Sequence, residues 1–283
     1  MGRDLLLQAG DAGYPTRLGD LRDPPRALWA RGNLSLLDRP CVAIVGTRRA
    51  TAYGERVARE LGRILAGAGA TIVSGLARGI DACAHLGALD AGGATVAVLG
   101  TGVDVVYPRG HADLQQTIAE RGLLLSEIEP SHAAHGGSFP LRNRIIAALS
   151  LATIVVEAGV KSGALITANH AIELGRSLGA VPGPIDVPQA EGSNLLLRDT
   201  AAAITSMADA ITLAGLVAPI HVADLPEQGV ERRLWDALAG GPADLDTLCT
   251  RASLPAHDGM AAVSALELRG MIECALSGEI RRM

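Results

Sequence analysis

Lysine, aromatic residues and paired cysteines are almost missing from this chain of 283 residues. Lys161 is the single lysine among 25 basic residues, and aromatics make up 2%, with one phenylalanine, Phe139. The four cysteines lie far apart without a CxxC pair, which argues against a disulfide framework or a zinc site and for a reducing compartment. No apolar run reaches the roughly 18 residues of a membrane span. We therefore expect a cytoplasmic protein without a membrane partner.

An excess of positive charge is also missing, since the net charge is −5. Residues 1–220 hold 19 basic and 20 acidic side chains, and residues 221–283 hold 6 and 10. This excludes a broad basic surface that would bind nucleic acid over most of the protein. Any nucleic-acid site must therefore be a local cluster of basic residues in the first 220 residues. Residues 256–270 carry only Arg269 against Asp258 and Glu267. The tail is therefore expected to bind protein or regulate dimerisation, and not to bind duplex DNA.

Short apolar runs alternate with helical stretches from residue 41 onward. The runs lie at 41–45, 71–74, 95–99, 123–126, 153–157 and 180–181, and the helices at about 53–67, 79–91, 111–121, 141–150 and 163–175. Uninterrupted Val/Ile/Leu runs are typical of strands buried on both faces, and their alternation with helices indicates βαβ units. The pattern predicts an α/β protein with an extended Rossmann-type, doubly wound, mostly parallel sheet.

Composition divides the chain into four parts. Residues 1–35 form an irregular lead-in rich in Pro, Arg and Asp, with one strand expected at 27–30. The Rossmann-type domain covers 36–214, and a linker follows over 215–228. Residues 229–283 show three short helical patterns and a final extended segment. That order predicts a small winged-helix-like domain.

Two glycine-containing turns follow strands and are candidates for binding phosphate. The first holds Gly46, Thr47 and Arg48; the second holds Ser74, Gly75, Arg78, Gly79 and Asp81. Ligands of open parallel sheets bind at the carboxyl ends of the strands, where glycine admits a close approach and free helix amides face an anion. Arginine adds a bidentate phosphate donor. A tight turn with a solvated arginine or a helix cap is the alternative for each.

Two further segments add cations. Phe139 stands three residues before Arg142, followed by Asn143 and Arg144. An exposed aromatic beside arginines suits base stacking with backbone contact, although burial in the core is the usual fate of phenylalanine. The fourth segment contains Lys161, Ser162, Gly163 and Thr167 at an expected helix start. It suits an anion, but no glycine stands five residues before Lys161, so it is not a P-loop.

Motifs for catalysis are absent from the sequence. Val105 replaces the third glycine of a GxGxxG fingerprint, and no GxSxG or HExxH spacing occurs; His132 and His135 stand without matched carboxylates. The sequence therefore predicts no enzyme activity, no metal and no cofactor. A nucleotide-processing, Rossmann-like enzyme of the phosphoribohydrolase type is the alternative, because similar turns would hold its substrate. The PGGxGT-type loop of such enzymes is not present at Pro182-Gly183-Pro184.

The ordered set of motifs resembles the DNA-processing protein A family (DprA, also called Smf) over nearly the whole chain. The matching stretches are IVGTR at 44–48, SGLARGIDACAH at 74–85, YP at 107–108, LLSE at 124–127, FPLRNRIIAALS at 139–150, VVEAGVKSGALITA at 155–168, AVPG at 180–183 and GSNLLL at 192–197. The resemblance departs at Asp199-Thr200, which replaces the usual glycine-alanine, and in the loop 129–138.

The resemblance implies a homodimer that binds single-stranded DNA without sequence preference, protects it, and loads the RecA recombinase during natural transformation. It also implies which turns line the DNA site. These residues are Arg48, Ser74, Gly75, Arg78, Phe139, Arg142, Asn143, Arg144, Lys161, Ser162 and Gly163. We add Gly46, Thr47, Gly79, Asp81 and Thr167 from the same turns as candidate DNA-binding residues.

Overall fold

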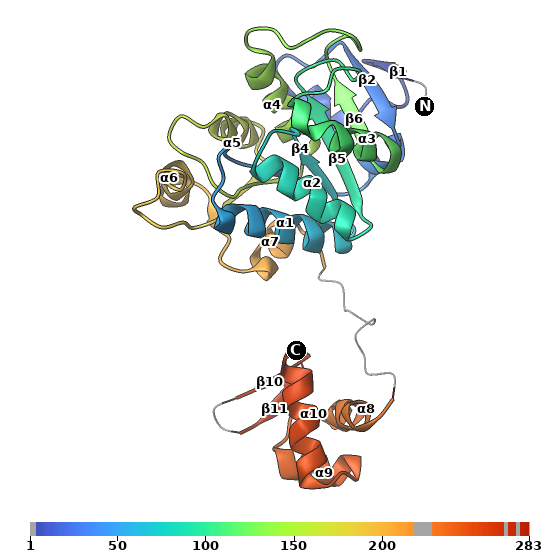
Figure 1. The fold of residues 1–283 in the computed structure, drawn as a ribbon, viewed down its shortest axis with the longest axis vertical. Helices are drawn as coiled ribbons and strands as arrows, with labels where there is room; N and C mark the ends of the chain where they lie inside the picture. Colours follow the sequence, from blue (N-terminus) through green and yellow to red (C-terminus); the bar gives the residue numbers. More distant parts are fainter. Residues whose placement is uncertain (1–3, 218–227, 269–270, 276–277, 283) are drawn as a thin grey trace. The chain divides into compact units, whose positions relative to one another are not determined.

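The computed structural model describes residues 4–217, 228–268, 271–275 and 278–282. The chain divides into two compact units, residues 1–219 and 220–283 (Figure 1). Most of the linker predicted at 215–228 lies outside the described residues. Within the described residues, no helix has the length and apolar character needed to cross a membrane.

The large unit is built on one nine-stranded sheet in the order β1-β2-β6-β5-β4-β3-β7-β8-β9. Strands β3 to β9 run parallel, whereas β2 is antiparallel to both β1 and β6. The strands are β1 Leu5–Gln8, β2 Ala27–Gly32, β3 Cys41–Val45, β4 Thr71–Ser74, β5 Ala94–Leu99, β6 Leu123–Ser126, β7 Ala152–Val155, β8 Ser177–Ala180 and β9 Ala202–Ala203. The predicted doubly wound, mostly parallel sheet is therefore confirmed.

Helices cover both faces of this sheet (Figure 1). One face carries α1 Ala52–Gly67, α2 Ile80–Asp90, α3 Ala112–Arg121 and α7 Met207–Leu213; the other carries α4 Ser138–Leu149, α5 Gly163–Glu173 and α6 Glu191–Asp199. Strand β3 shows why both faces are apolar, since Val42 and Ile44 pack under α1 while Ala43 and Val45 face the opposite layer. Short 3-10 helices lie at Thr16–Asp20, Leu34–Asp38 and Arg109–His111.

Two strands near the start of the chain, β1 and β2, join the sheet, which corrects the prediction of a separate irregular lead-in. Strand β2 contains the expected strand at 27–30 and extends it to Gly32, pairing Trp29 with Ser126 of β6. Strand β1 was not expected. Its run of three leucines, Leu5 to Leu7, is shorter than the apolar runs of four or more residues that indicate a buried strand, and only one of its four residues is buried.

The small unit contains α8 Val230–Ala237, a 3-10 turn at Leu238–Gly240, α9 Leu245–Ala252, α10 Ala256–Leu268, and the antiparallel strands β10 Ile272–Cys274 and β11 Ile280–Arg282. Its own core includes Leu234, Leu248, Leu266 and Ile272. Three helices followed by a two-stranded hairpin form a winged helix. The predicted winged-helix-like domain is confirmed, and its final extended segment is this hairpin.

Candidate functional site

A cavity of about 720 Å³ opens at the carboxyl ends of β3 and β7. The strand order changes direction here, because β4 lies on one side of β3 and β7 on the other. Such a switch point leaves a crevice between the loops in open α/β sheets. Four segments line this large cavity: the turn after β3, the start of α2, the start of α4, and the loop that leads into α5.

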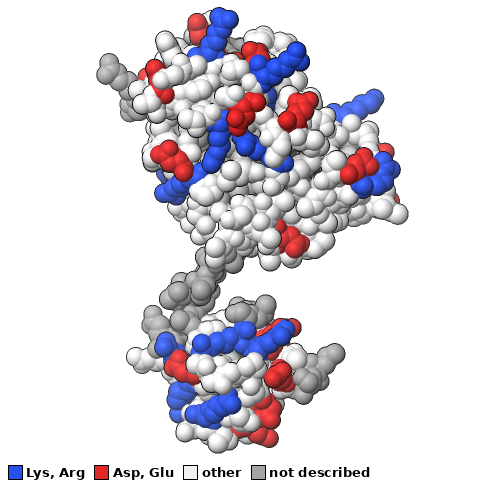
Figure 2. Space-filling model, turned by 180° about the vertical axis from the view of Figure 1, so that it is seen from behind, with Lys and Arg blue, Asp and Glu red and all other residues white. Residues whose placement is uncertain are grey.

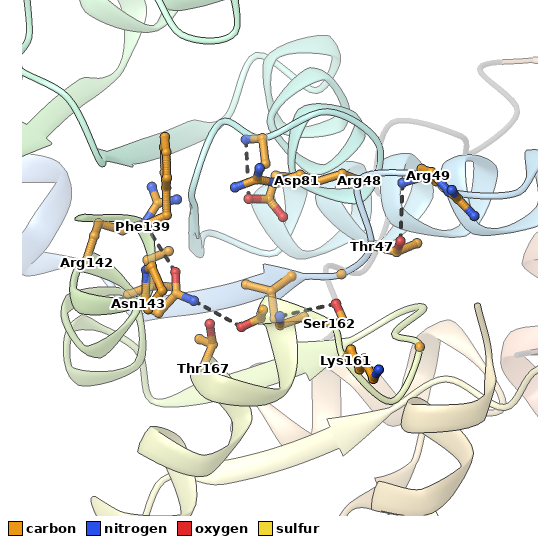
Figure 3. A pocket seen from close by; sticks show the side chains of 18 residues that line it. Thr47, Arg48, Arg49, Asp81, Phe139, Arg142, Asn143, Lys161, Ser162 and Thr167 are labelled. Atoms are coloured by element: carbon orange, nitrogen blue, oxygen red, sulfur yellow. Dashed lines mark hydrogen bonds between the residues drawn. The ribbon is translucent and has the colours of Figure 1, made fainter. Parts of the chain in front are cut away.

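Exposed cations stand on opposite walls of the large cavity. Arg48 and Arg49 lie on the turn after β3, and Lys161 lies on the loop before α5 (Figure 3). Ser162 caps α5 by accepting a hydrogen bond from the amide of Ala164 at 3.3 Å. The partial positive charge of the α5 N-terminus therefore adds to that of Lys161. These groups together favour an anion in the cavity.

Asp81 is the sole carboxylate among the described residues that line the large cavity. Its side chain is 6% exposed and accepts hydrogen bonds from the amides of Gly75 at 3.1 Å and Ala77 at 3.4 Å. Burial raises the pKa of this carboxyl, and the Arg142 guanidinium and the backbone amides oppose that rise. Asp81 therefore holds the second turn in shape through these hydrogen bonds from the amides.

Arg142 joins α4 to the second turn. Its Nη1 donates to the carbonyl of Gly75 at 2.9 Å, and its Nε donates to Asn143 Oδ1 at 3.3 Å. Burial lowers the pKa of Arg142 to about 10, against the effect of Asp81. The guanidinium is nevertheless protonated at neutral pH. It contributes positive charge from inside the wall, while Arg48 and Lys161 contribute it from the surface.

Glu157 holds the turn after β3 in place through hydrogen bonds, a role that was not predicted from the sequence. Its carboxylate accepts hydrogen bonds from the Thr51 amide at 2.9 Å and from Thr51 Oγ1 at 2.5 Å. Its backbone carbonyl accepts from the Thr47 amide at 2.7 Å. Thr51 is also the N-cap of α1. A buried acid at the end of a strand, next to a glycine-rich loop, is the signal that could have indicated this bracing.

Gly79 sets the distance between the two turns. Its φ is +73°, a conformation that favours glycine, and an added Cβ would lie 2.5 Å from the carbonyl oxygen of Thr47. The turn after β4 can therefore approach the turn after β3 only with glycine at this position. Gly79 shapes the site and does not line a cavity among those described.

A smaller cavity of about 260 Å³ adjoins the large one and shares five lining residues with it, Arg48, Arg49, Ala77, Phe139 and Arg142. Gly75, Leu76, Arg78, Tyr107 and Pro108 complete its walls. Phe139 is half-buried, with its ring against Gly100 and the Arg48 guanidinium 5.1 Å from its centroid. It is neither a core residue nor a fully exposed one.

The structure brings together most of the predicted site residues. Those that line the large cavity are Gly46, Thr47, Arg48, Asp81, Phe139, Arg142, Asn143, Lys161, Ser162, Gly163 and Thr167. Gly75 and Arg78 line the small cavity. The sequence reasoning did not select Arg49, Ala77, Gly159 or Tyr107, which also line these walls.

Ser74 and Arg144 face away from both cavities. Ser74 is fully buried and donates a hydrogen bond to the carbonyl of Ile44 at 2.6 Å, which joins β4 to β3. Arg144 is 7% exposed and donates to Glu127 at 2.8 Å on the other side of α4. Their contacts are structural, and a ligand in the cavities would not reach them in this conformation.

No three His, Cys, Asp or Glu side chains among the described residues come together in a way that could hold a metal ion. The cavity walls offer cations, amides and aromatic rings instead. Their chemistry is that of recognising phosphate and a flat ring.

His85 lies buried in α2 behind the second turn. Its Nδ1 is 2.6 Å from Thr95 Oγ1, and that hydroxyl donates its proton to the carbonyl of Ile72 at 3.0 Å. Nδ1 is therefore the donor, and Nε2 is unprotonated and has no hydrogen-bond partner among the described residues. Burial, with Arg142 and His111 nearby, lowers the pKa of His85 from 6.5 to about 3.

We expect His85 to make the large unit less stable as the pH falls below 6.5. The unfolded chain takes up this proton near pH 6.5, and the folded chain does so only near pH 3, so the unfolded state is favoured between these values. At 1.36 kcal/mol per pH unit, the free energy of unfolding should fall about 2 kcal/mol more in the wild type than in His85→Gln between pH 6.5 and pH 5.

Urea unfolding followed by tryptophan fluorescence measures this difference. Trp29 and Trp235 are the two tryptophans of the chain, so a Trp235→Phe background reports the large unit alone. Equal pH dependence of the two proteins would contradict a neutral, buried His85.

The fold and the site define a Rossmann-type protein with a cavity lined by arginine and lysine at the carboxyl ends of its strands, followed by a winged-helix unit. Comparison with known proteins identifies its family. The family model of DNA recombination-mediator protein A matches residues 5–215, and that of the DprA winged helix domain matches residues 221–278. The chain therefore belongs to the DNA-processing protein A (DprA/Smf) family.

Similar proteins agree with this assignment. The chain is 38% identical to the putative DNA processing protein DprA of Mycobacterium tuberculosis, covering 95% of this chain and 72% of that protein. It is 37% identical to Protein Smf of Escherichia coli, covering 98% and 77%.

Two solved structures are also similar. The Streptococcus pneumoniae DNA processing protein A has a TM-score of 0.71 and 41% identity, covering 74% of this chain and 73% of that one. The Helicobacter pylori protein, whose structure concerns its single-stranded DNA binding mode, has a TM-score of 0.67 and 36% identity, covering 75% and 95%.

Proposed function

We propose that this chain binds single-stranded DNA in the two adjoining cavities, without sequence preference. The observation that carries the proposal is the pairing of cations and aromatic rings at one site. Arg48, Arg49 and Lys161 can hold phosphates, and Phe139 and Tyr107 lie beside them. A cationic groove with aromatic rings is the arrangement by which single strands are bound regardless of sequence.

The mixed distribution of charge on the large unit supports a DNA site that is confined to the cavities. Figure 2 shows basic and acidic side chains interspersed over the face of the large unit that it draws. A duplex presents its phosphates on the outside and its bases stacked inside, so it would gain little from a concave site with aromatic walls. A single strand can place a phosphate and an unpaired base there together.

We propose that the site performs no catalysis. Asp81 is buried and hydrogen-bonded to two amides, and Glu157 is occupied by Thr51. A general acid or base needs to reach a reacting group within hydrogen-bond distance. The phosphoribohydrolase alternative is therefore not favoured, because among the described residues at the site neither Asp81 in the cavity wall nor Glu157 behind the first turn is free to act on a substrate.

We extend the proposal to protection of incoming DNA, to loading of the RecA recombinase on the bound strand, and to action as a cytoplasmic homodimer in natural transformation. The support is membership of the DprA/Smf family. The structure of the Helicobacter pylori relative, which concerns its single-stranded DNA binding mode, supports single-stranded DNA as the ligand.

Fluorescence anisotropy with a labelled dT oligonucleotide tests the proposal. We expect saturable binding that weakens with salt, with a slope of log K against log salt of about −0.7 for each phosphate contact. Unlabelled mixed-sequence single strands should compete as well as dT, and a blunt duplex of equal length should compete poorly. Preferential competition by the duplex, or no binding at low salt, would contradict the proposed function.

A further inference from the structure

Lys161 has no side-chain contact that fixes its position in the site. Its ammonium group makes no hydrogen bond or ion pair with any of the described residues, and the side chain is exposed. The loop between β7 and α5 carries it along one wall of the large cavity (Figure 3). The place from which Lys161 can reach a phosphate therefore depends on what holds the backbone of this loop.

The first turn of α6 holds the beginning of that loop. A helix leaves its first amide groups without partners inside the helix, and an N-cap side chain usually accepts a hydrogen bond from one of them. The N-cap of α6 is Ala190, whose methyl group cannot accept a hydrogen bond. The amides of Gly192 and Ser193 donate instead to the carbonyl of Ala158, at 2.7 Å and 3.1 Å. The loop therefore supplies the cap that the sequence of α6 lacks.

Glycine at position 192 is needed for this contact. A Cβ on Gly192 would lie 2.7 Å from the carbonyl oxygen of Ala158 and 2.9 Å from that of Gly159, closer than a Cβ normally approaches backbone atoms. Both oxygens belong to the backbone, and Ala158 is fully buried, so no side chain can turn aside to make room. A larger residue at this position would therefore push the loop, and Lys161 with it, away from α6.

Further contacts prevent α6 and the loop from shifting together. Asn194 of α6 accepts a hydrogen bond from the amide of Gly183 at 3.1 Å and donates one to the carbonyl of Gly183 at 3.0 Å. These bonds tie the helix start to the segment that follows β8. At the end of the loop, Asn143 of α4 donates to the carbonyl of Gly163 at 3.0 Å. The loop is thus held by α6 at one end and by α4 at the other.

We infer that Gly192, Ser193 and Asn194 are positioning residues for DNA binding, which act by placing Lys161 where it meets a phosphate. This inference rests on the proposed function and deepens it. None of the three is among the described residues that line the two cavities. Lys161 supplies the charge, and the first turn of α6 determines where that charge stands. The start of the stretch 192–197, which the sequence singled out without a role, thereby acquires one.

A double-mutant cycle with dT oligonucleotides tests this dependence. Lys161→Ala removes the phosphate contact and should weaken binding about 10-fold or more, and Gly192→Ala should produce part of that loss, about 5-fold. In the Lys161→Ala background, Gly192→Ala should weaken binding by less than about 2-fold, because the charge that it displaces is already absent. In the Arg48→Ala background it should keep its full effect, since the turn of Arg48 is held separately by Glu157.

The control is a second tightly packed glycine, at the opposite side of the sheet. Gly122 directly precedes β6, and a Cβ there would lie 2.5 Å from the carbonyl oxygen of Thr95. Gly122→Ala should lower the midpoint of thermal unfolding, and the folded variant should bind DNA like the wild type. If Gly192→Ala does not fold, Asn194→Ala takes its place in the cycle, because it removes two hydrogen bonds without adding an atom.

Wild-type affinity of the folded α6 variant would overturn the inference. An equal loss of affinity in the Lys161→Ala and Arg48→Ala backgrounds would also overturn it, because the first turn of α6 would then support the fold in general and not the position of Lys161. Failure of the wild-type protein to bind any single strand would instead contradict the proposed function itself.

Discussion

Replacing both Arg48 and Lys161 with alanine is expected to weaken binding of a dT oligonucleotide by at least about 100-fold. Each cation would contribute a charge-assisted hydrogen bond to phosphate, worth about 1.5–3 kcal/mol, and 1.4 kcal/mol corresponds to a factor of ten in affinity. Both side chains are exposed on loops at the cavity. The folded structure should therefore survive the change, and anisotropy at fixed salt measures the loss.

The matched control removes two positive charges from the opposite side of the sheet, where the parallel strands begin. Arg39 immediately precedes Pro40 and β3, and Arg121 is two residues before β6, so both stand at the amino ends of strands. Both are exposed. The Arg39→Ala/Arg121→Ala variant should keep nearly the wild-type affinity. Equal loss in the two double variants would show that net charge, and not this cavity, determines binding.

Replacing Asp81 with alanine is expected to lower the free energy of unfolding of the large unit by about 2–6 kcal/mol, because two backbone amides would lose their acceptor at a cost of about 1–3 kcal/mol each. These are the amides of Gly75 and Ala77, and the Arg142 guanidinium would also lose the electrostatic attraction of the Asp81 carboxyl. Chemical denaturation with the same Trp29 readout measures the change.

Two further variants separate the charge from the hydrogen bonds. Asp81→Asn keeps an acceptor for the amides and should be destabilised less than Asp81→Ala. Asp81→Ala/Arg142→Met removes the unpaired charge and should recover part of the lost stability. An Asp81→Ala protein as stable as the wild type would contradict the view that the buried Asp81 carboxyl holds the second turn.

The parallel strands β3 to β7 could be predicted from sequence because each is a short apolar run buried on both faces. The expected strands at 41–45, 71–74 and 123–126 coincide with β3, β4 and β6. The edges could not be predicted in the same way. Strand β9 consists of two exposed alanines, and β1 contains a run of only three leucines, so both fall short of the four or more apolar residues that indicate a buried strand.

The orientation of site residues was harder to predict than their presence. Arg142 and Arg144 are two residues apart on α4, about 200° around a helix, so they must face opposite ways. The sequence could not show which one faces the cavity, because that depends on how α4 packs against β5 and β3. Tyr107 lies outside any periodic segment. Only the folded chain shows its ring beside Phe139.

The salt dependence of binding, measured for the wild type and the Arg48→Ala/Lys161→Ala variant side by side, tests the central claim most directly. Each phosphate contact on a single strand contributes about 0.7 to the slope of log K against log salt, so two lost contacts should reduce its magnitude by about 1.4. An unchanged slope would mean that these cations do not hold phosphates, and that the cavity at the ends of β3 and β7 is not where the strand binds.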